Sequence, residues 1–183
     1  MPSPPITSSP PAGRSSIAIR LAREDDSAAI AAIYNQGIAE GIATFETEPR
    51  SAADISRQFR EKDPRFPTLV VERAGRVVAF AGAGPYRTRP CYAGIAEHSV
   101  YVEAGERRTG AGGAALEALI QTYEQLGFWK LVSRIFPENH ASLALHDRLG
   151  FRRVGIYHRH ARLAGIWRDC IIVERLLGPA AQD

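Results

Sequence analysis

Apolar and polar positions along the chain follow the period of a strand in some segments and the period of a helix in others. Residues 17–21 alternate in steps of two, which predicts a strand. Capping residues at 25–27 precede a segment whose apolar positions recur at helical spacing, namely Ile30, Ile33, Tyr34 and Ile38. A second amphipathic helix is predicted from Ser51, with Ile55 and Phe59 on one face.

The later segments follow the same two periods. Residues 68–72 and 76–81 are predicted strands on either side of Ala74-Gly75, a compact hairpin turn. Another strand ends at Val102, and a glycine-rich loop then leads into a helix whose inward side chains are predicted to be Leu116, Leu119, Ile120 and Tyr123. A buried strand, a helix and two final strands are predicted over residues 131–135, 139–149, 152–157 and 170–174. This order predicts a mixed α/β sheet with helices on both faces.

Length and composition indicate one globular domain. The chain has 183 residues, with a hydrophobic share of 45% and a charged share of 23%, and no apolar run approaches membrane-spanning length. Residues 1–16 are rich in Pro and Ser and lack the apolar region of a secretory signal, so we expect a disordered tail there. The domain is expected to span residues 17–177, with a short tail over 178–183.

Charge and cysteine content exclude several classes of protein. The net charge of +3 suits a polyanionic ligand but gives no concentrated Lys/Arg stripe, so no nucleic-acid or membrane partner is expected. Cys91 and Cys170 are too few for a disulfide framework, and we expect reduced thiols in a cytoplasmic protein. His140, His158 and His160 show no metal-ligand spacing with cysteines or carboxylates, so no metal is predicted.

The most informative stretch is residues 97–113, where an apolar run and a short turn lead into a basic, glycine-rich loop at the start of a helix. The glycines among residues 110–113 lack side chains, so backbone N–H groups there can close around an anion at the positive end of the helix dipole. Arg107 and Arg108 add fixed positive charge. The loop lacks the Gly-Lys-Ser/Thr ending of a nucleotide triphosphatase loop. We therefore expect a polyphosphate site of another kind.

The spacing Arg107-x-x-Gly110-x-Gly112 resembles the pyrophosphate-binding signature of the GNAT family of N-acetyltransferases, which bind acetyl-CoA. Residues 139–151 resemble the next helix of that family, with an Asn near the start and Leu-Gly-Phe at the end, and residues 100–102 resemble its pantetheine-binding strand. The similarity extends over residues 17–177. It implies that acetyl-CoA is the co-substrate and that its ligands are Val100, Tyr101, Val102, Arg107, Arg108, Thr109, Gly110, Ala111, Gly112, Gly113 and Asn139.

Two residues are candidates for the chemistry of acetyl transfer. An α-amine with a pKa near 8 is mostly protonated at neutral pH, so a nearby base helps. Glu97, just before the predicted cofactor strand, matches the position of the general base in the subfamily described next. His146 stands where many family members carry a Tyr that protonates the leaving thiolate, and it is interpreted as an acid, a substrate ligand or a structural residue. His98 is expected to point to the opposite face from Glu97 and to pack in the core.

Several segments resemble one branch of the family, the phosphinothricin, methionine sulfoximine and arsinothricin N-acetyltransferases: residues 43–49, 84–92, 97–102, 108–110 and 165–169, together with His146. The sequence of residues 43–49 resembles the arsinothricin enzymes more, because Glu46 stands where phosphinothricin enzymes tend to carry Arg. The resemblance implies substrates that are glutamate analogues with a tetrahedral side-chain group. Cationic and aromatic side chains suit such substrates, and the candidates, with Glu46, are Phe45, Tyr86, Arg87, Arg89 and Tyr92.

The sequence thus predicts direct acetyl transfer within a ternary complex, with Glu97 as base and with resistance to the toxin as the outcome. A homodimer is implied by the resemblance alone. Two alternatives stay open. One is an acetyltransferase for another amine, such as a peptide N-terminus or an aminoglycoside. The other is a non-catalytic acyl-CoA-binding regulatory domain.

Overall fold

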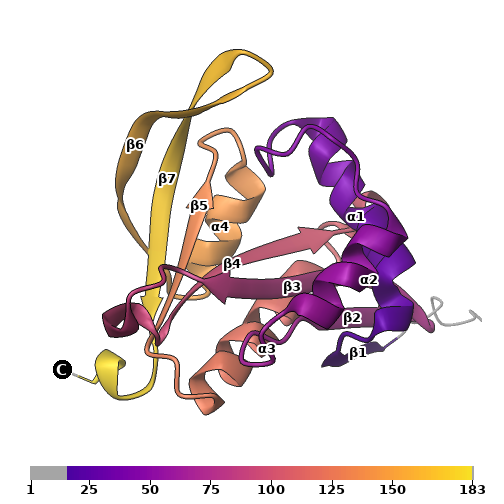
Figure 1. Ribbon diagram of the computed structural model, residues 1–183, viewed down its shortest axis with the longest axis horizontal. Helices are drawn as coiled ribbons and strands as arrows, with labels where there is room; N and C mark the ends of the chain where they lie inside the picture. Colours follow the sequence, from indigo (N-terminus) through magenta and orange to yellow (C-terminus); the bar gives the residue numbers. More distant parts are fainter. Residues whose placement is uncertain (1–15, 183) are drawn as a thin grey trace, which may run out of the picture.

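The computed structural model describes residues 16–182 and forms one seven-stranded sheet with helices on both faces (Figure 1). The strands are β1 (Ile17–Leu21), β2 (Leu69–Arg73), β3 (Arg76–Pro85), β4 (Ile95–Val102), β5 (Lys130–Ile135), β6 (Arg152–Leu163) and β7 (Ile166–Leu176). The α-helices are α1 (Ser27–Glu40), α2 (Ala52–Glu61), α3 (Ala111–Gln125) and α4 (His140–Arg148). Short 3-10 helices are η1 (Glu24–Asp26), η2 (Pro90–Tyr92), η3 (Ala104–Glu106) and η4 (Gly178–Ala181).

The strands follow the order β1-β2-β3-β4-β5-β7-β6, and every neighbouring pair is antiparallel except β4 and β5. The parallel pairing of β4 with β5 covers three positions only, from Ile95 with Lys130 to Glu97 with Val132. After Glu97, β4 stays paired with β3, while β5 turns away toward β7. The strands therefore diverge, and among the described strands none covers the β5 side of residues 98–102.

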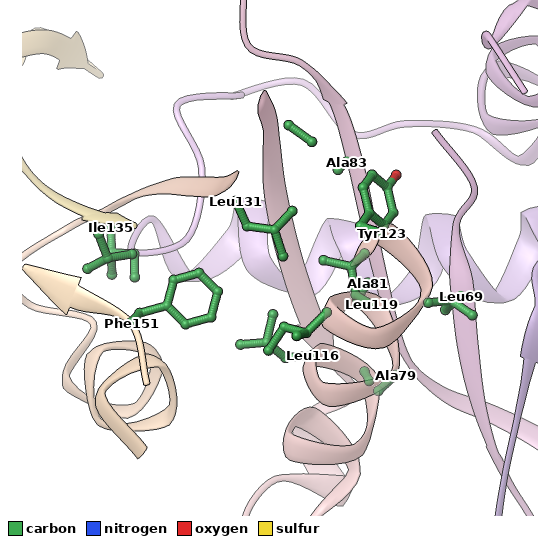
Figure 2. Close-up of a cluster of buried hydrophobic side chains, with 14 of the residues drawn as sticks. Leu69, Ala79, Ala81, Ala83, Leu116, Leu119, Tyr123, Leu131, Ile135 and Phe151 are labelled. Carbon is green, nitrogen blue, oxygen red and sulfur yellow. The ribbon is translucent and has the colours of Figure 1, made fainter. Parts of the chain in front are cut away.

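Two of the three hydrophobic clusters among the described residues pack helices against the two faces of the sheet. The larger lies between the sheet and α3, where Leu116, Leu119 and Tyr123 are fully buried against strand residues such as Leu131 (Figure 2). The smaller joins α1 and α2 to the other face through Ile30, Ile33, Ile55, Val70 and Phe80. Burial of apolar surface on both faces fixes the position of β4 in the middle of the sheet.

Local chemistry explains where the elements begin and end. Ser51 and Asp54 form a capping box at the start of α2, with the Ser51 side chain accepting a hydrogen bond from the Asp54 N–H. Ala74 and Gly75 both have positive φ, 51° and 75°, as the two-residue turn between β2 and β3 requires. The mixed α/β fold with helices on both faces, predicted from the order of segments, is confirmed.

The last two strands differ from the prediction. They were expected over residues 152–157 and 170–174, but β6 and β7 run to Leu163 and from Ile166 as one long hairpin, the yellow arm at the top of Figure 1. The prediction was too short because β6 is exposed over most of its length and so lacks an apolar alternation. Its turn, Ala164-Gly165, repeats the Ala-Gly pair and the positive φ values of the first hairpin.

The chain termini extend beyond the described residues. The predicted tail over residues 1–16 lies, apart from Ser16, outside them, and so does residue 183. Within residues 16–182, no helix is long and apolar enough to cross a membrane.

Candidate active site

Two cavities meet at β4, on either side of Glu97. The wide cavity, of about 470 Å³, opens where β4 and β5 diverge, and it is lined by residues 42–48, 97–101 and 133–136 with Asn139, Ser142 and His146. The helix-side cavity, of about 260 Å³, lies between the sheet and helices α1 and α2. Glu97, Ser99 and Tyr101 line both cavities, because alternate residues of β4 face the same side of the sheet.

Glu97 occupies the junction of the two cavities. It is the third residue of β4, opposite Gly84 of β3 and Val132 of β5, whereas the sequence placed it just before the strand. Its carboxylate is 27% exposed and accepts a hydrogen bond from Nε of Arg134 at 2.5 Å. The candidate base is therefore accessible from the cavities and paired with a guanidinium from β5.

His98 points to the opposite face from Glu97, as predicted, and meets His146 of α4. Their Nε2 atoms are 3.0 Å apart, and both rings are almost fully buried. The His146 Nδ1 lies 2.7 Å from the Ser142 carbonyl oxygen, which can only accept, so Nδ1 carries the hydrogen. In the neutral ring Nε2 is then the acceptor, and the Nε2–H of His98 donates to it.

Burial lowers the pKa of both imidazoles. Loss of hydration is the main cause for each ring, and the neighbouring His146 lowers the pKa of His98 further. Both rings are therefore neutral at pH 7. The single hydrogen of His146 is directed at Ser142, so in this arrangement its Nε2 has no hydrogen to give to a leaving group.

The glycine-rich loop leads into α3 as the sequence predicted. Gly110 has a φ of 95°, a left-handed conformation that turns the chain into the helix, and α3 begins at Ala111. The first N–H groups of a helix have no intrahelical acceptor, so those of Ala111, Gly112 and Gly113 can receive an anion. A Cβ at Gly112 would lie 3.0 Å from Val102 Cγ2, so the absence of a side chain also lets α3 pack against β4.

The side chains around this loop fit a polyphosphate ligand. Arg107 and Arg108 are exposed, and Arg107 pairs with Glu40 at 2.7 Å. Arg73 of β2 donates to the Thr109 carbonyl at 3.3 Å and to its hydroxyl at 3.2 Å, which holds the loop in place. Exposed cations beside free N–H groups match the charge of the CoA pyrophosphate.

The other predicted cofactor residues have mixed positions. Val100 and Val102 pack against the larger core cluster, while Tyr101 stacks on Phe80 with ring centroids 5.2 Å apart. Asn139 caps α4 by accepting from the Ser142 N–H, and its Nδ2 donates to the Ile42 carbonyl at 3.2 Å. Asn139 thus fastens the loop after α1, although it lines the wide cavity.

The predicted substrate residues separate into two groups. Phe45 and Glu46 line the wide cavity, where Phe45 meets Phe136 edge-on with centroids 4.7 Å apart and Glu46 pairs with Arg50 at 2.9 Å. The other four lie on the loop between β3 and β4 and line neither cavity: Tyr86, Arg87, Arg89 and Tyr92. Arg87 lies over the Tyr86 ring, 5.2 Å from its centroid.

Sequence reasoning missed three basic residues, namely Lys62, Arg73 and Arg134. Lys62 lines the helix-side cavity, Arg73 holds the glycine-rich loop, and Arg134 pairs with Glu97. Each contacts a residue that lies in another segment of the fold, so its role cannot be inferred from its neighbours in the sequence. In the sequence the one available signal was the placement of Arg134 in a predicted strand otherwise made of buried residues.

Comparisons with known proteins show the family of the chain. Residues 30–151 match the model of the acetyltransferase (GNAT) family. The chain is 32% identical over 156 residues to the phosphinothricin N-acetyltransferase of Streptomyces viridochromogenes, covering 85% of each. It is 33% identical over 166 residues to the L-methionine sulfoximine/L-methionine sulfone acetyltransferase of Pseudomonas paraeruginosa, covering 90% of this chain and 96% of the relative.

A crystal structure of a GNAT superfamily phosphinothricin acetyltransferase from Sinorhizobium meliloti in complex with AcCoA has a TM-score of 0.84 to this chain. The two share 30% sequence identity, and the match covers 91% of each. The extent of these matches confirms the predicted family and the predicted co-substrate. The chain therefore belongs to the acetyltransferase (GNAT) family and is an acetyl-CoA-dependent N-acetyltransferase.

Proposed function

We propose that this enzyme acetylates the α-amine of glutamate-analogue toxins, among them phosphinothricin, methionine sulfoximine and arsinothricin, and so confers resistance to them. The observation that carries the proposal is the position of Glu97, a carboxylate at the junction of two cavities on either side of β4. One cavity opens where the cofactor strand diverges from its neighbour, and the other is of amino-acid size. The names of the relatives support this substrate class.

The proposed reaction is direct transfer in a ternary complex. Glu97, through a water molecule or directly, takes a proton from the ammonium form of the substrate. The neutral amine attacks the acetyl carbon of the thioester, while a backbone N–H of β4 near Val100 stabilises the charge on the oxygen. Collapse of the intermediate breaks the carbon–sulfur bond, the attacking nitrogen loses its extra proton to give the amide, and CoA leaves as a thiolate that takes up a proton. Arg134 holds the Glu97 carboxylate in place until the substrate ammonium group competes for it.

For His146 the geometry favours a structural role. Its Nε2 accepts from His98 and its Nδ1–H donates to Ser142, so both ring nitrogens are used. We propose that His146 fixes the start of the diverging strands by tying α4 to β4. Protonation of the leaving thiolate then falls to solvent or to the proton carried from the amine.

The enzyme is proposed to act as a homodimer that uses the β6–β7 hairpin. This hairpin carries an unusual number of exposed large apolar side chains: Val154, Ile156, Tyr157, Ile166, Trp167 and Leu176. We propose that a second copy of the chain covers them, because exposed apolar side chains concentrated on one element are typical of an interaction site. We further propose that Arg87 and Arg89, which line neither cavity, contact the α-carboxylate of the substrate at the mouth of the site.

The test is the release of CoA thiol from acetyl-CoA with phosphinothricin, methionine sulfoximine, arsinothricin and glutamate, each measured side by side. Turnover of the tetrahedral analogues with little turnover of glutamate is the expected result. The residues around Glu46 favour the highest kcat/KM on arsinothricin. Turnover of peptide N-termini or aminoglycosides instead would replace the proposed substrate. Binding of acetyl-CoA with no turnover of any amine would support the regulatory alternative.

A further inference from the structure

The helix-side cavity contains a lysine that the reaction above does not use. Its walls are β3 and β4 on one side and α1 and α2 on the other, and Lys62 follows directly after the end of α2. A volume of about 260 Å³ is just below the roughly 300 Å³ of the smallest drug-sized pockets, so it suits an amino-acid side chain. Glu97 lines the same cavity. An amino-acid substrate with its α-amine near Glu97 could therefore extend its side chain through the cavity toward Lys62.

Lys62 has no acidic partner. Its Nζ donates a hydrogen bond to the Thr68 hydroxyl at 2.9 Å, and no carboxylate of residues 16–182 forms an ion pair with it. Burial lowers the pKa of Lys62 to about 8, with no neighbouring charge contributing to the change. At neutral pH the amine is therefore still mostly charged, and it is a partly buried cation with donor capacity to spare.

The other charged groups that line this cavity are already paired. Arg50 forms an ion pair with Glu46 at 2.9 Å, and Glu97 forms one with Arg134. Lys62 is thus the lining charge that lacks a counterion among the described residues. Keeping an unpaired charge away from water is unfavourable, and an anion in the cavity would offset that cost.

Glycine 82 keeps the space next to this lysine open. A Cβ at Gly82 would lie 3.0 Å from the Thr68 hydroxyl oxygen, the atom that holds the Lys62 amine. A larger residue on β3 would therefore displace Thr68 and fill the cavity. The small residue and the hydroxyl together leave the amine facing an open volume.

We propose that Lys62 binds the anionic end of the acceptor's side chain, and so selects α-amino acids whose side chain ends in a tetrahedral acid such as a phosphinate or an arsinate. This inference rests on the proposed function and deepens it. Phosphinothricin and arsinothricin each carry two anionic groups. Lys62 binds the side-chain acid, which leaves the α-carboxylate for the loop with Arg87 and Arg89.

The experiment uses a pair of compounds that differ in charge but hardly in shape. Phosphinothricin ends in a methylphosphinate, which is an anion, and methionine sulfone ends in a methylsulfone, which is neutral. Their dissociation constants are measured by calorimetry in the presence of CoA, for the full-length wild-type enzyme and for Lys62→Met. Lys130→Met is the matched control, because Lys130 pairs with Glu174 and lines neither cavity. Thermal unfolding of each variant checks folding, and Lys62→Gln replaces Lys62→Met if the latter does not fold.

We expect the wild-type enzyme to bind phosphinothricin about 10- to 100-fold more tightly than methionine sulfone, as a charge-assisted hydrogen bond allows. Lys62→Met should remove most of this preference without weakening the binding of the sulfone, and Lys130→Met should keep it. An equal loss for both compounds, a preference that survives in Lys62→Met, or no preference in the wild type would overturn the role of Lys62.

The same proteins assayed for CoA thiol release separate the two proposals. A wild type that binds phosphinothricin through Lys62 without turnover would contradict the proposed function and leave the anion site standing. Turnover of phosphinothricin by the wild type, with an unchanged preference for phosphinothricin over methionine sulfone in Lys62→Met, would support the proposed function and overturn the anion site.

Discussion

Glu97 is ion-paired and yet must receive a proton in the proposed reaction. Replacing it with Gln keeps its size and most of its hydrogen bonds but removes the base. We expect Glu97→Gln to lower kcat at neutral pH by about 10² to 10⁴ while the KM for acetyl-CoA stays the same. Steady-state thiol release measures both. Glu103→Gln is the control, because Glu103 follows β4, pairs with Arg76 and lines neither cavity. Full activity in Glu97→Gln would remove this residue as the base.

The buried pair His98 and His146 predicts how stability depends on pH. In the unfolded chain both rings titrate near pH 6.5, whereas burial lowers their pKa values in the folded state, to about 3 for His98. Below pH 6.5 the unfolded state therefore binds protons that the folded state does not. The stabilisation is complete above pH 6.5 and is lost as the pH falls toward the folded pKa values.

We expect His98 to account for about 1.6 kcal/mol of lost unfolding free energy between pH 6.5 and pH 5, and His146 to add a loss of the same sign. Urea unfolding at the two pH values should show a smaller loss for His98→Gln than for the wild type. His140→Gln, at an exposed position of α4, should behave like the wild type. An identical pH dependence in all three proteins would mean that the pair is charged in the folded state.

At the residue scale, the sequence predicted the roles that depend on local position. The opposite orientations of Glu97 and His98 followed from the period of a strand. The contact between His98 and His146, 48 residues apart, did not, because no local pattern encodes it. Lys62 and Arg134 could not be predicted for the same reason. The role of each cation depends on its neighbours in the folded protein, which are Thr68 for Lys62 and Glu97 for Arg134.

At the scale of elements, the glycine-rich loop proposed to bind the cofactor leads into the start of α3, which also packs against β4. Gly112→Val would place side-chain atoms against Val102, at a position where even a Cβ lies 3.0 Å from Val102 Cγ2. We expect this substitution to raise the dissociation constant of acetyl-CoA more than tenfold and to lower the unfolding free energy by about 1 to 3 kcal/mol. Calorimetry and urea unfolding measure the two effects.

Gly105→Ala is the matched control for this prediction. A Cβ at Gly105, in η3, would meet no atom within 4 Å, and its backbone φ is not in the left-handed region. This variant should bind acetyl-CoA normally. Normal binding in Gly112→Val as well would refute the assignment of the loop.

Most elements could be predicted because they are amphipathic, with one face in a hydrophobic cluster. The β6–β7 hairpin could be predicted only in part, because its outer strand buries little and its pairing is irregular between Tyr157 and Ala161. The Ala164-Gly165 turn was the available signal, since the same dipeptide at Ala74-Gly75 was read as a hairpin.

For the whole molecule, the exposed apolar side of this hairpin predicts association of two copies. We expect the wild type to be a dimer by light scattering coupled to size-exclusion chromatography, and Ile156→Glu to be a monomer because a charge cannot be buried unpaired in the contact. Leu126→Glu, at an equally exposed apolar residue after α3, should remain a dimer. A wild type that is monomeric at all concentrations would contradict the proposed assembly.

The fold as a whole followed from the order of its elements, whereas the cavities did not. Their shape depends on where β5 leaves β4, and three residue pairs decide that point. The resemblance to the GNAT family predicted a cofactor between β4 and β5. Periodicity alone predicted the two strands but not the gap between them.

The short contact between β4 and β5 divides the sheet into a four-stranded and a three-stranded half that share a narrow seam. Past the seam, the backbone of β4 presents hydrogen-bonding groups along a gap. The pantetheine arm of acetyl-CoA, which contains amide groups of its own, would fill this gap and form hydrogen bonds with the β4 backbone, as an additional strand would. Bound acetyl-CoA would then link the two halves of the sheet. Amide hydrogen exchange would therefore slow in both β4 and β5 as CoA is added.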